Sequence, residues 1–215
     1  MKVTLISYTK SPDNYKTLQD LVAYCARVSN PSNQNNIETN EKLIRYLIKN
    51  NHWSPLEMVN ICLEIETTRD IARQILRHRS FSFQEFSQRY AIADLGFEYR
   101  DARLQDLNNR QNSIETDNVE LQQLWEKKQE ELVEVAKTTY DWAIQNGIAK
   151  EQARAVLTEG NTASRLYMNG TLRSWVHYIQ LRSKNGTQKE HAEVAIACAE
   201  AIKDIFPMIS EFVTV

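Results

Sequence analysis

Hydrophobic and polar positions along the 215-residue chain follow two different periods, which predict two kinds of element. From Val59 to Glu66 apolar and polar side chains alternate, so we expect a strand with one buried face over residues 58–67. Residues 2–8, which are apolar with β-branched members, predict a first strand, and residues 164–168 predict a short one.

Apolar residues three or four positions apart predict that much of the remaining chain is helical. The expected helices cover residues 17–28, 38–49, 119–146, 150–157, 172–182 and 188–209. The long helix should end at Gly147, because glycine accepts the left-handed conformation that often terminates a helix. A short amphipathic helix is expected over residues 69–79, with Thr67 and Asp70 as its T-x-x-D start signal.

Two segments lack a clear period. Residues 80–93 mix aromatic, hydroxyl and amide side chains, and we expect them to be irregular and then extended. Residues 97–118 are polar and contain several asparagines, which predicts a loop or lid. Strands and helices alternate without a regular βαβ order, so the sequence predicts an α+β fold in a single domain over residues 1–215.

Composition and charge exclude several classes of protein. With 42% hydrophobic and 25% charged residues the chain has an ordinary globular composition, and its net charge of −2 disfavours broad binding to nucleic acids or anionic membranes. No stretch approaches the ~18 apolar residues of a membrane span, and the N-terminus is too polar for a signal peptide. The three cysteines form no CxxC pair and the four histidines have no zinc spacing. We therefore expect a cytoplasmic protein without zinc or disulfides.

Positive charge is concentrated in one segment. Between Thr67 and Tyr90 there are five arginines, no lysine and two acids, whereas residues 115–134 hold seven acids and two lysines. Arginine rather than lysine suits bidentate recognition of phosphate. At a spacing of four, Arg69, Arg73 and Arg77 would share one face of the predicted helix.

Two other interpretations of this basic segment remain open. The first is a solvated face on a surface helix. The second is a single-stranded nucleic-acid module with four stacking platforms, Phe81, Phe83, Phe86 and Tyr90, which the overall charge disfavours. Three polar residues in a row at 77–79 cannot form one solvent stripe, however. Together with the aromatic and hydroxyl residues after them, they suit a planar heteroaromatic ligand that carries a phosphate.

Several short motifs resemble one known family. Residues 77–79 and Ser87 match the RHR-x7-S motif of the ThyX family, and the flanking ARQ at 72–74 and SQRY at 87–90 are also similar to it. Further similar elements are HWSPLE at 52–57, ARAVL at 153–157, LRS at 172–174 and LR at 181–182. The chain thus resembles flavin-dependent thymidylate synthases from about Ala26 to its last helix.

The resemblance implies a fold, a reaction and an assembly. The expected fold is of ThyX type, an antiparallel sheet packed with several helices, including a long helix after residue 117. The expected reaction converts dUMP to dTMP with FAD as cofactor, 5,10-methylenetetrahydrofolate as carbon donor and NADPH as hydride source. A homotetramer with active sites at its subunit interfaces is also implied. A related flavoenzyme that methylates or hydroxymethylates another pyrimidine nucleotide is the alternative.

The resemblance also implies roles for individual residues. Arg182 would be catalytic, because its guanidinium would favour ionisation of a uracil ring N–H. The implied cofactor contacts are His52, Ser54, Arg77, His78, Arg79, Glu85, Thr171, Arg173 and His177. The implied substrate contacts are Gln74, Arg77, Glu85, Ser87, Gln88, Arg89, Arg154 and Arg182. Of these, Arg89 and Arg154 together would suit a doubly charged phosphate.

Other reactive residue types are expected to have no chemical role. Ser87 has neither a G-x-S-x-G elbow nor an evident Asp–His pair, so we expect it to bind substrate rather than attack it. Cys25, Cys62 and Cys198 lie in apolar-periodic stretches and are expected to be small buried hydrophobes. His191, on the last predicted helix, is expected to be structural.

Overall fold

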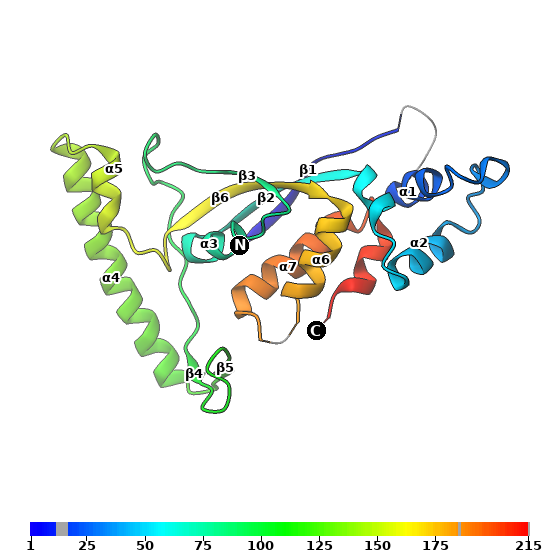
Figure 1. The fold of residues 1–215 in the computed structure, drawn as a ribbon. Helices are drawn as coiled ribbons and strands as arrows, with labels where there is room; N and C mark the ends of the chain where they lie inside the picture. The colour runs from blue at the N-terminus through cyan, green and yellow to red at the C-terminus, as the bar shows by residue number, and fades with distance from the viewer. Residues whose placement is uncertain (12–16, 185, 215) are drawn as a thin grey trace.

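The computed structural model describes residues 1–11, 17–184 and 186–214, and it is built around a four-stranded antiparallel sheet (Figure 1). The strands lie in the order β1 (Lys2–Tyr8), β2 (Asn60–Thr68), β6 (Ala163–Thr171) and β3 (Ser82–Glu85). The two central strands pair over all nine of their residues. Segments that are distant in the sequence therefore lie side by side in the sheet.

One face of the sheet carries the hydrophobic core. Alternate residues of the two central strands are fully buried there: Ile61, Leu63, Ile65, Leu166 and Met168. Two helices, α6 (Leu172–Arg182) and α7 (Lys189–Ile202), lie together beneath the sheet in Figure 1. The short helix α3 (Arg69–Ile75) follows directly from the end of β2. The burial pattern confirms the strand that the alternation predicts.

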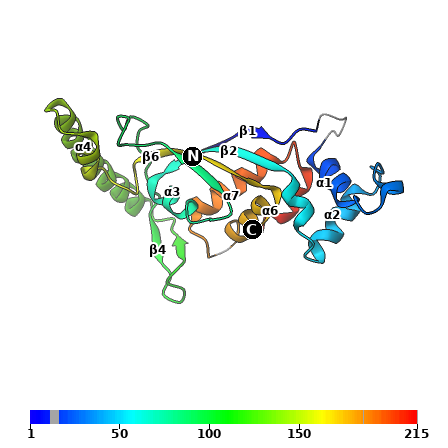
Figure 2. The same ribbon diagram turned by 45° about the horizontal axis from the view of Figure 1, so that its top comes forward.

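Further helices lie at one end of this core (Figures 1 and 2). They are α1 (Leu18–Ala26), α2 (Asn40–Lys49) and the 3₁₀ segments η1 (Pro31–Asn33) and η2 (Ser54–Met58). A last 3₁₀ segment, η4 (Pro207–Phe212), contributes Ile209 and Phe212 to the core.

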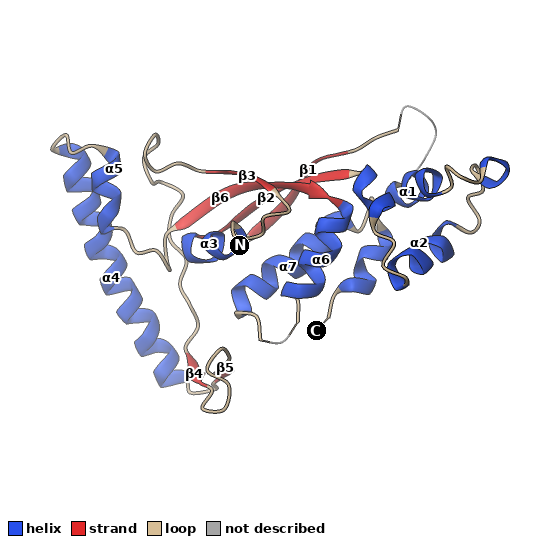
Figure 3. Cartoon of the chain, in the orientation of Figure 1, coloured by secondary structure: helices blue, strands red, loops and turns tan. Residues whose placement is uncertain are grey.

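At the other end the chain extends away from the core as one long helix, α4 (Val119–Gln145), drawn in blue in Figure 3 and seen in both views (Figures 1 and 2). Packed against it are α5 (Lys150–Ala153) and the 3₁₀ segment η3 (Arg154–Val156), and near its start lies a hairpin of β4 (Arg103–Gln105) and β5 (Ser113–Glu115). Five large apolar residues of α4 are more than half exposed, namely Val119, Leu124, Leu132, Val135 and Trp142. A single chain thus leaves part of this helix without a partner.

Several sequence predictions are confirmed. The α+β class, the first strand and the helices at 17–28, 38–49, 119–146 and 172–182 agree with the structure within a few residues. Gly147 has the left-handed conformation expected after the long helix, with φ of 74°. The strand predicted at 164–168 is longer, since β6 begins at Ala163 and ends at Thr171.

The helix predicted over residues 69–79 is shorter than expected. α3 ends at Ile75, and residues 77–79 lie in the turn before β3. The turn is needed because Phe81 inserts into the core, with its ring centroid 4.8 Å from that of Trp175. Arg77 lies beyond the end of α3 and therefore does not share a helix face with Arg69 and Arg73, as the spacing had predicted.

Other boundaries also differ. Thr67 lies inside β2, and Thr68 occupies the N-cap position of α3 without a side-chain capping hydrogen bond. The last predicted helix, 188–209, is shorter, since α7 ends at Ile202. It could not continue through Phe206, because Pro207 disfavours helical geometry in the residue before it. The segment 150–157 is divided into α5 and η3.

The two segments without a clear period contain more structure than expected. In residues 80–93 the strand comes first and the irregular part follows, the reverse of the prediction. Residues 97–118 contain the β4–β5 hairpin. Its turn is closed by Asp106, whose carboxylate accepts hydrogen bonds from the backbone N–H groups of Asn108 and Asn109 at 2.9 and 3.0 Å.

Among the residues described, no helix is both long and apolar enough to cross a membrane. Within the same part of the chain, no group of three or more His, Cys, Asp or Glu side chains is arranged to hold a metal ion. The three cysteines are free thiols; Cys198 is buried and the other two are partly buried. Burial raises the pKa of all three, which makes them poor nucleophiles.

Candidate active site

A cavity of about 390 Å³ lies among α3, the turn after β3 and η3. We call it the arginine pocket, and it is lined by Arg69, Arg73, Gln88, Glu151, Arg154, Ala155, Leu157 and Glu159. Arg69 and Arg73 lie one turn apart on α3 and therefore share a face. Gln88 and Arg154, two of the predicted substrate residues, are brought together in this cavity although they are distant in the sequence.

Glu85, on β3, holds the two α3 arginines beside the pocket. One carboxylate oxygen lies 3.6 Å from Nη1 of Arg69 and the other lies 3.3 Å from Nη1 of Arg73. The hydroxyl of Ser164, on the neighbouring strand, donates a hydrogen bond to the same carboxylate at 3.0 Å. Burial lowers the pKa of Arg69, and the charge of Glu85 opposes that shift. Glu85 thus fixes the positions of two cations.

Two groups in the arginine pocket are available to a ligand. Arg154 makes no ion pair with any residue in the described part of the chain. Gln88 is only 3% exposed, and its side-chain nitrogen has no hydrogen-bond partner among the residues that the structure describes. A buried N–H without a partner costs about 1–3 kcal/mol, so a ligand that accepts its hydrogen bond would recover that free energy. The combination favours an anionic ligand with hydrogen-bond acceptors.

The structure adds two residues that the sequence did not assign to the site, Arg69 and Arg73. Their spacing of four had identified them as one ridge, but nothing in the sequence indicated that η3 would face it. The predicted Arg89 lies at the edge of this region, where its Nε is 3.6 Å from Glu151. Ser87 begins the turn that carries Gln88, and its carbonyl accepts a hydrogen bond from the N–H of Tyr90 at 3.0 Å.

A second group, which we call the histidine cluster, contains the predicted residues Gln74, His78 and Arg182 together with Tyr178 and His191. Arg182 donates a hydrogen bond from Nε to Nε2 of His78 at 3.0 Å. His78 is therefore neutral, with its proton on Nδ1. Burial, followed by the charges of Arg182 and Arg77, lowers the pKa of His78 to about 4.

Gln74 connects this cluster to α7. Its side-chain oxygen lies 3.2 Å from Nδ1 of His191, and its side-chain nitrogen donates to the amide oxygen of Gln188 at 2.7 Å. The ring of His78 packs edge-on against that of Tyr178, with 4.9 Å between centroids. Gln74 and Arg182, both predicted to contact substrate, thus belong to two hydrogen-bonded groups that meet where the rings of His78 and Tyr178 pack together.

A third group, the tryptophan cluster, joins η2 to α6 and consists of Trp53, Glu57, Arg173 and His177. Arg173 forms an ion pair with Glu57, and the rings of Trp53 and His177 lie 4.3 Å apart. Burial and then the charge of Arg173 lower the pKa of His177. The predicted cofactor residue Arg173 is therefore anchored by Glu57.

Other predicted cofactor residues flank these groups. His52 precedes Trp53, and Ser54 is the first residue of η2. Thr171 caps the N-terminus of α6 by accepting a hydrogen bond from the N–H of Ser174 at 3.3 Å. Arg77 and Arg79 are exposed and form no ion pair within the described residues.

The predicted substrate residues therefore divide into two sets in a single chain. Gln88 and Arg154 line the arginine pocket, whereas neither Gln74 nor Arg182 does. Because Arg69 and Arg73 come from the same helix as Gln74, the two sets are connected through α3. A single chain does not enclose all of the predicted groups in the arginine pocket.

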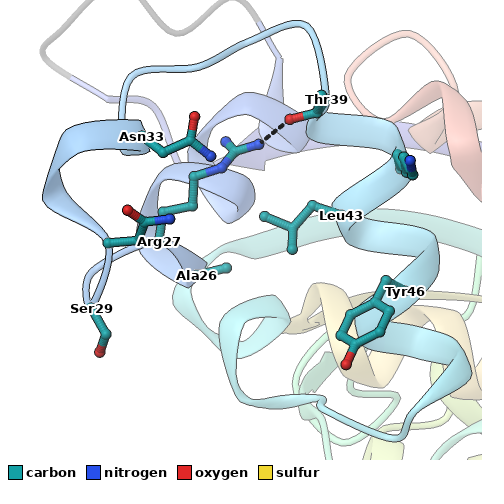
Figure 4. Close-up of a pocket in the computed structure, with 9 residues that line it drawn as sticks. Ala26, Arg27, Ser29, Asn33, Thr39, Leu43 and Tyr46 are labelled. Atoms are coloured by element: carbon teal, nitrogen blue, oxygen red, sulfur yellow. Dashed lines mark hydrogen bonds between the residues drawn. The ribbon is translucent and has the colours of Figure 1, made fainter.

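A larger cavity of about 520 Å³ lies among α1, η1 and α2, and none of the predicted site residues lines it (Figure 4). Arg27 borders it and is 6% exposed. Its guanidinium donates to the carbonyl of Asn36 at 2.7 Å, to Asn40 at 2.6 Å and to Thr39 at 3.0 Å. Arg27 therefore ties α1 to α2. At the edge of this cavity, the ring of Tyr46 lies 6.2 Å from that of His52.

Comparison with known proteins agrees with the resemblance found in the motifs. A family model described as thymidylate synthase complementing protein matches residues 4–208. A probable flavin-dependent thymidylate synthase of Paramecium bursaria Chlorella virus 1 is 47% identical over 212 residues, which cover 98% of both chains. A flavin-dependent thymidylate synthase of Synechocystis sp. is also 47% identical, over 89% of this chain and 87% of the other.

Solved structures give a concordant result. The UMP/dUMP methylase PolB from Streptomyces cacaoi, bound with 5-Br dUMP, has a TM-score of 0.84 to this chain. The two are 27% identical, and the match covers 98% of this chain and 93% of PolB. With a family match over nearly all of its residues and relatives that are 47% identical, the chain belongs to the ThyX family of flavin-dependent thymidylate synthases.

Proposed function

We propose that this protein is a flavin-dependent thymidylate synthase that converts dUMP to dTMP, with 5,10-methylenetetrahydrofolate as carbon donor and NADPH as reductant through FAD. The observation that carries the proposal is the arginine pocket. Within the described part of the chain, Arg154 has no ion-pair partner there and the side-chain nitrogen of Gln88 has no hydrogen-bond partner. Family membership and the likeness to a dUMP methylase support the same reaction.

The arginine pocket suits the nucleotide monophosphate. Arg154 would bind the phosphate, with Arg89 joining it from the rim. The side chains of Arg89 and Glu151 are about half exposed and 3.6 Å apart, so their attraction is weak and Arg89 can exchange it for a phosphate. Gln88 would donate its free N–H to the same ligand, and Glu85 and Ser87 lie beside it on the same segment.

Arg182 is proposed as the catalytic residue. Because its Nε is occupied by His78, its terminal nitrogens remain to donate to the uracil ring. A fixed guanidinium stabilises the negative charge that forms on a uracil ring nitrogen when it loses its proton. This raises electron density at the carbon to be methylated. His78 is neutral and therefore does not repel that guanidinium. Gln74 would hold the ring from the same cluster.

Residues suited to hold FAD surround the tryptophan cluster and the turn after α3. The exposed guanidiniums of Arg77 and Arg79 fit a diphosphate. We propose His52, Ser54, His78, Glu85, Thr171, Arg173 and His177 as the remaining contacts. When bound and reduced, the flavin supplies the hydride; the protein orients the reactants and excludes water.

A homotetramer would unite the two sets of substrate residues. The exposed apolar residues of α4, including Leu132, Val135 and Trp142, fit a surface that is covered by other subunits. We infer that Arg154 of one subunit and Arg182 of another face the same dUMP, since the arginine pocket of a single chain does not contain Arg182. We further propose a cytoplasmic location, which the three free thiols support.

A second candidate is a related flavoenzyme that methylates or hydroxymethylates another pyrimidine nucleotide. The likeness to a methylase of both UMP and dUMP favours testing this. Initial rates with dUMP, UMP and dCMP at equal concentration separate the possibilities. The proposed function predicts that dUMP is preferred.

The decisive assay is anaerobic product analysis with dUMP, 5,10-methylenetetrahydrofolate and NADPH. The proposal predicts dTMP and consumption of NADPH. A hydroxymethylated product, or no product with a protein that binds FAD and dUMP, would contradict it.

A further inference from the structure

His191 is fully buried, and each of its two ring nitrogens has a polar partner. Nδ1 lies 3.2 Å from the side-chain oxygen of Gln74, and Nε2 lies 3.2 Å from the hydroxyl of Tyr178. Tyr178 is itself only 1% exposed. The three groups lie on different helices, α7, α3 and α6, so their hydrogen bonds join these helices.

The chemistry of these groups sets the direction of each hydrogen bond. An amide oxygen only accepts, so Nδ1 of His191 must carry the proton and donate to Gln74. Nε2 is then an acceptor, and the hydroxyl of Tyr178 donates to it. The side-chain nitrogen of Gln74 donates to Gln188 at 2.7 Å, and Gln188 donates to Glu190 at 2.9 Å. Both ends of the Gln74 amide are therefore fixed.

We propose that His191 is a positioning residue for the substrate site: with its tautomer held by Tyr178, it fixes the orientation of the Gln74 amide toward the nucleotide. The inference rests on the proposed function, in which Gln74 contacts dUMP. Without His191 the amide could rotate and present oxygen where nitrogen is needed. From the sequence alone, His191 was expected to be only structural.

The surroundings keep His191 in the required neutral form. Burial, followed by the charge of Arg182, lowers the pKa of His191 to about 3. Burial also raises the pKa of Tyr178 well above its ordinary value, so its hydroxyl keeps the proton that it donates. The ring of His78, which accepts from Arg182, lies 6.1 Å from that of His191. The same cluster therefore positions both Gln74 and Arg182.

Two substitutions of His191 separate positioning from simple packing. The amide nitrogen of an asparagine can take the place of Nδ1 and still donate to Gln74. A glutamine reaches the place of Nε2 and meets Tyr178 but not Gln74. His191→Asn and His191→Gln both remove the ring, so both should lower thermal stability, while only the second releases Gln74.

The experiment compares dUMP affinity of the flavin-loaded wild type with that of the two variants, by the change in flavin absorbance on titration. We expect His191→Gln to bind dUMP at least about tenfold more weakly and His191→Asn to stay within about threefold of the wild type, with equal flavin content. Equal affinities in both variants, or losses that simply follow their melting temperatures, would overturn the inference. If the wild type itself does not bind dUMP, the proposed function fails instead.

If neither variant folds, Tyr178→Phe provides the second test. It keeps the ring and removes only the donor to Nε2, which frees the tautomer of His191. A raised KM for dUMP with an unchanged KM for the folate is expected. A wild-type KM for dUMP in that variant would contradict the assigned role.

Discussion

Arg182 and His78 are joined by a hydrogen bond from Nε to Nε2 at 3.0 Å, across α6 and the turn after α3. The bond exists only when His78 is neutral on Nε2, and the low pKa of His78, about 4, ensures this at physiological pH. Because Nε of Arg182 makes this bond, the two terminal nitrogens of the guanidinium remain to donate to a ligand. The proposed catalytic group is thus fixed before a substrate arrives.

Arg182→Ala should retain flavin but lose methyl transfer, because the charge that stabilises the ionised uracil is removed. We expect kcat to fall by at least about 100-fold, the usual cost of removing one group that stabilises transition-state charge. Formation of dTMP is measured beside flavin absorbance. Arg45→Ala, at an exposed ion pair with Glu211, is the matched control and should be unaffected. Normal turnover in Arg182→Ala would remove Arg182 from the mechanism.

Arg154→Ala should weaken dUMP binding by roughly 100-fold, since a charge-assisted contact to phosphate is lost. Binding is measured by calorimetry on the flavin-loaded protein. Deoxyuridine, which lacks the phosphate, serves as the matched ligand, and its weaker binding should not change. An equal loss for both ligands would show that Arg154 acts on the pocket as a whole rather than on the phosphate.

Gln88→Leu should separate stability from binding. Removing a buried N–H that has no partner should leave the ligand-free stability unchanged or raise it by up to about 1 kcal/mol. The same change should abolish the rise in melting temperature that dUMP causes. Gln145→Leu, at an exposed position on α4, is the control. An undiminished response to dUMP in Gln88→Leu would mean that this amide faces no ligand.

Stability should fall as the pH drops from 7 to 5. His78 and His191 have folded pKa values of about 4 and about 3, below the ordinary value of 6.5, so in this range only the unfolded chain takes up their protons. Each histidine should cost about 1–2 kcal/mol over those two units. Urea unfolding at several pH values measures this, and His191→Gln should reduce the slope. A free energy of unfolding that stays constant between pH 7 and 5 would contradict the lowered pKa values of the two histidines.

Gly170→Ala should destabilise the sheet beside the site. A Cβ there would lie 2.5 Å from Cδ1 of Phe81, whereas a Cβ at Gly160 would meet nothing within 4 Å. We expect a loss of about 1–3 kcal/mol in the free energy of unfolding for Gly170→Ala and little change for Gly160→Ala. Equal stabilities of the two variants in urea would contradict the packing of Phe81.

Local patterns predicted most elements but not where they end. The alternation around Ile61 and Ile65 identified β2, because a strand with one buried face has alternating apolar and polar residues. The end of α3 could not be read in the same way. It is set by Phe81, which must reach Trp175 in the core, and this contact exists only in the folded chain.

In the candidate site, too, the sequence predicted some residues and not others. Motifs named Gln88, Arg154 and Arg182, yet Arg69 and Arg73 were read only as a basic ridge, because their place in a cavity depends on η3 folding across α3. The two hydrogen bonds of His191 could not be predicted from the sequence for a related reason. Each of its partners lies on a different helix, and no spacing in the sequence relates the three.

The central claim is that one dUMP is held by Arg154 from one subunit and by Arg182 from another, and mixed oligomers test it directly. Chains that carry Arg154→Ala or Arg182→Ala are co-expressed, and dTMP formation by the mixed tetramers is measured. The account predicts recovery to about a quarter of wild-type activity, since some sites regain both arginines from different subunits. Mixed tetramers that bind flavin but remain as inactive as either parent would contradict it.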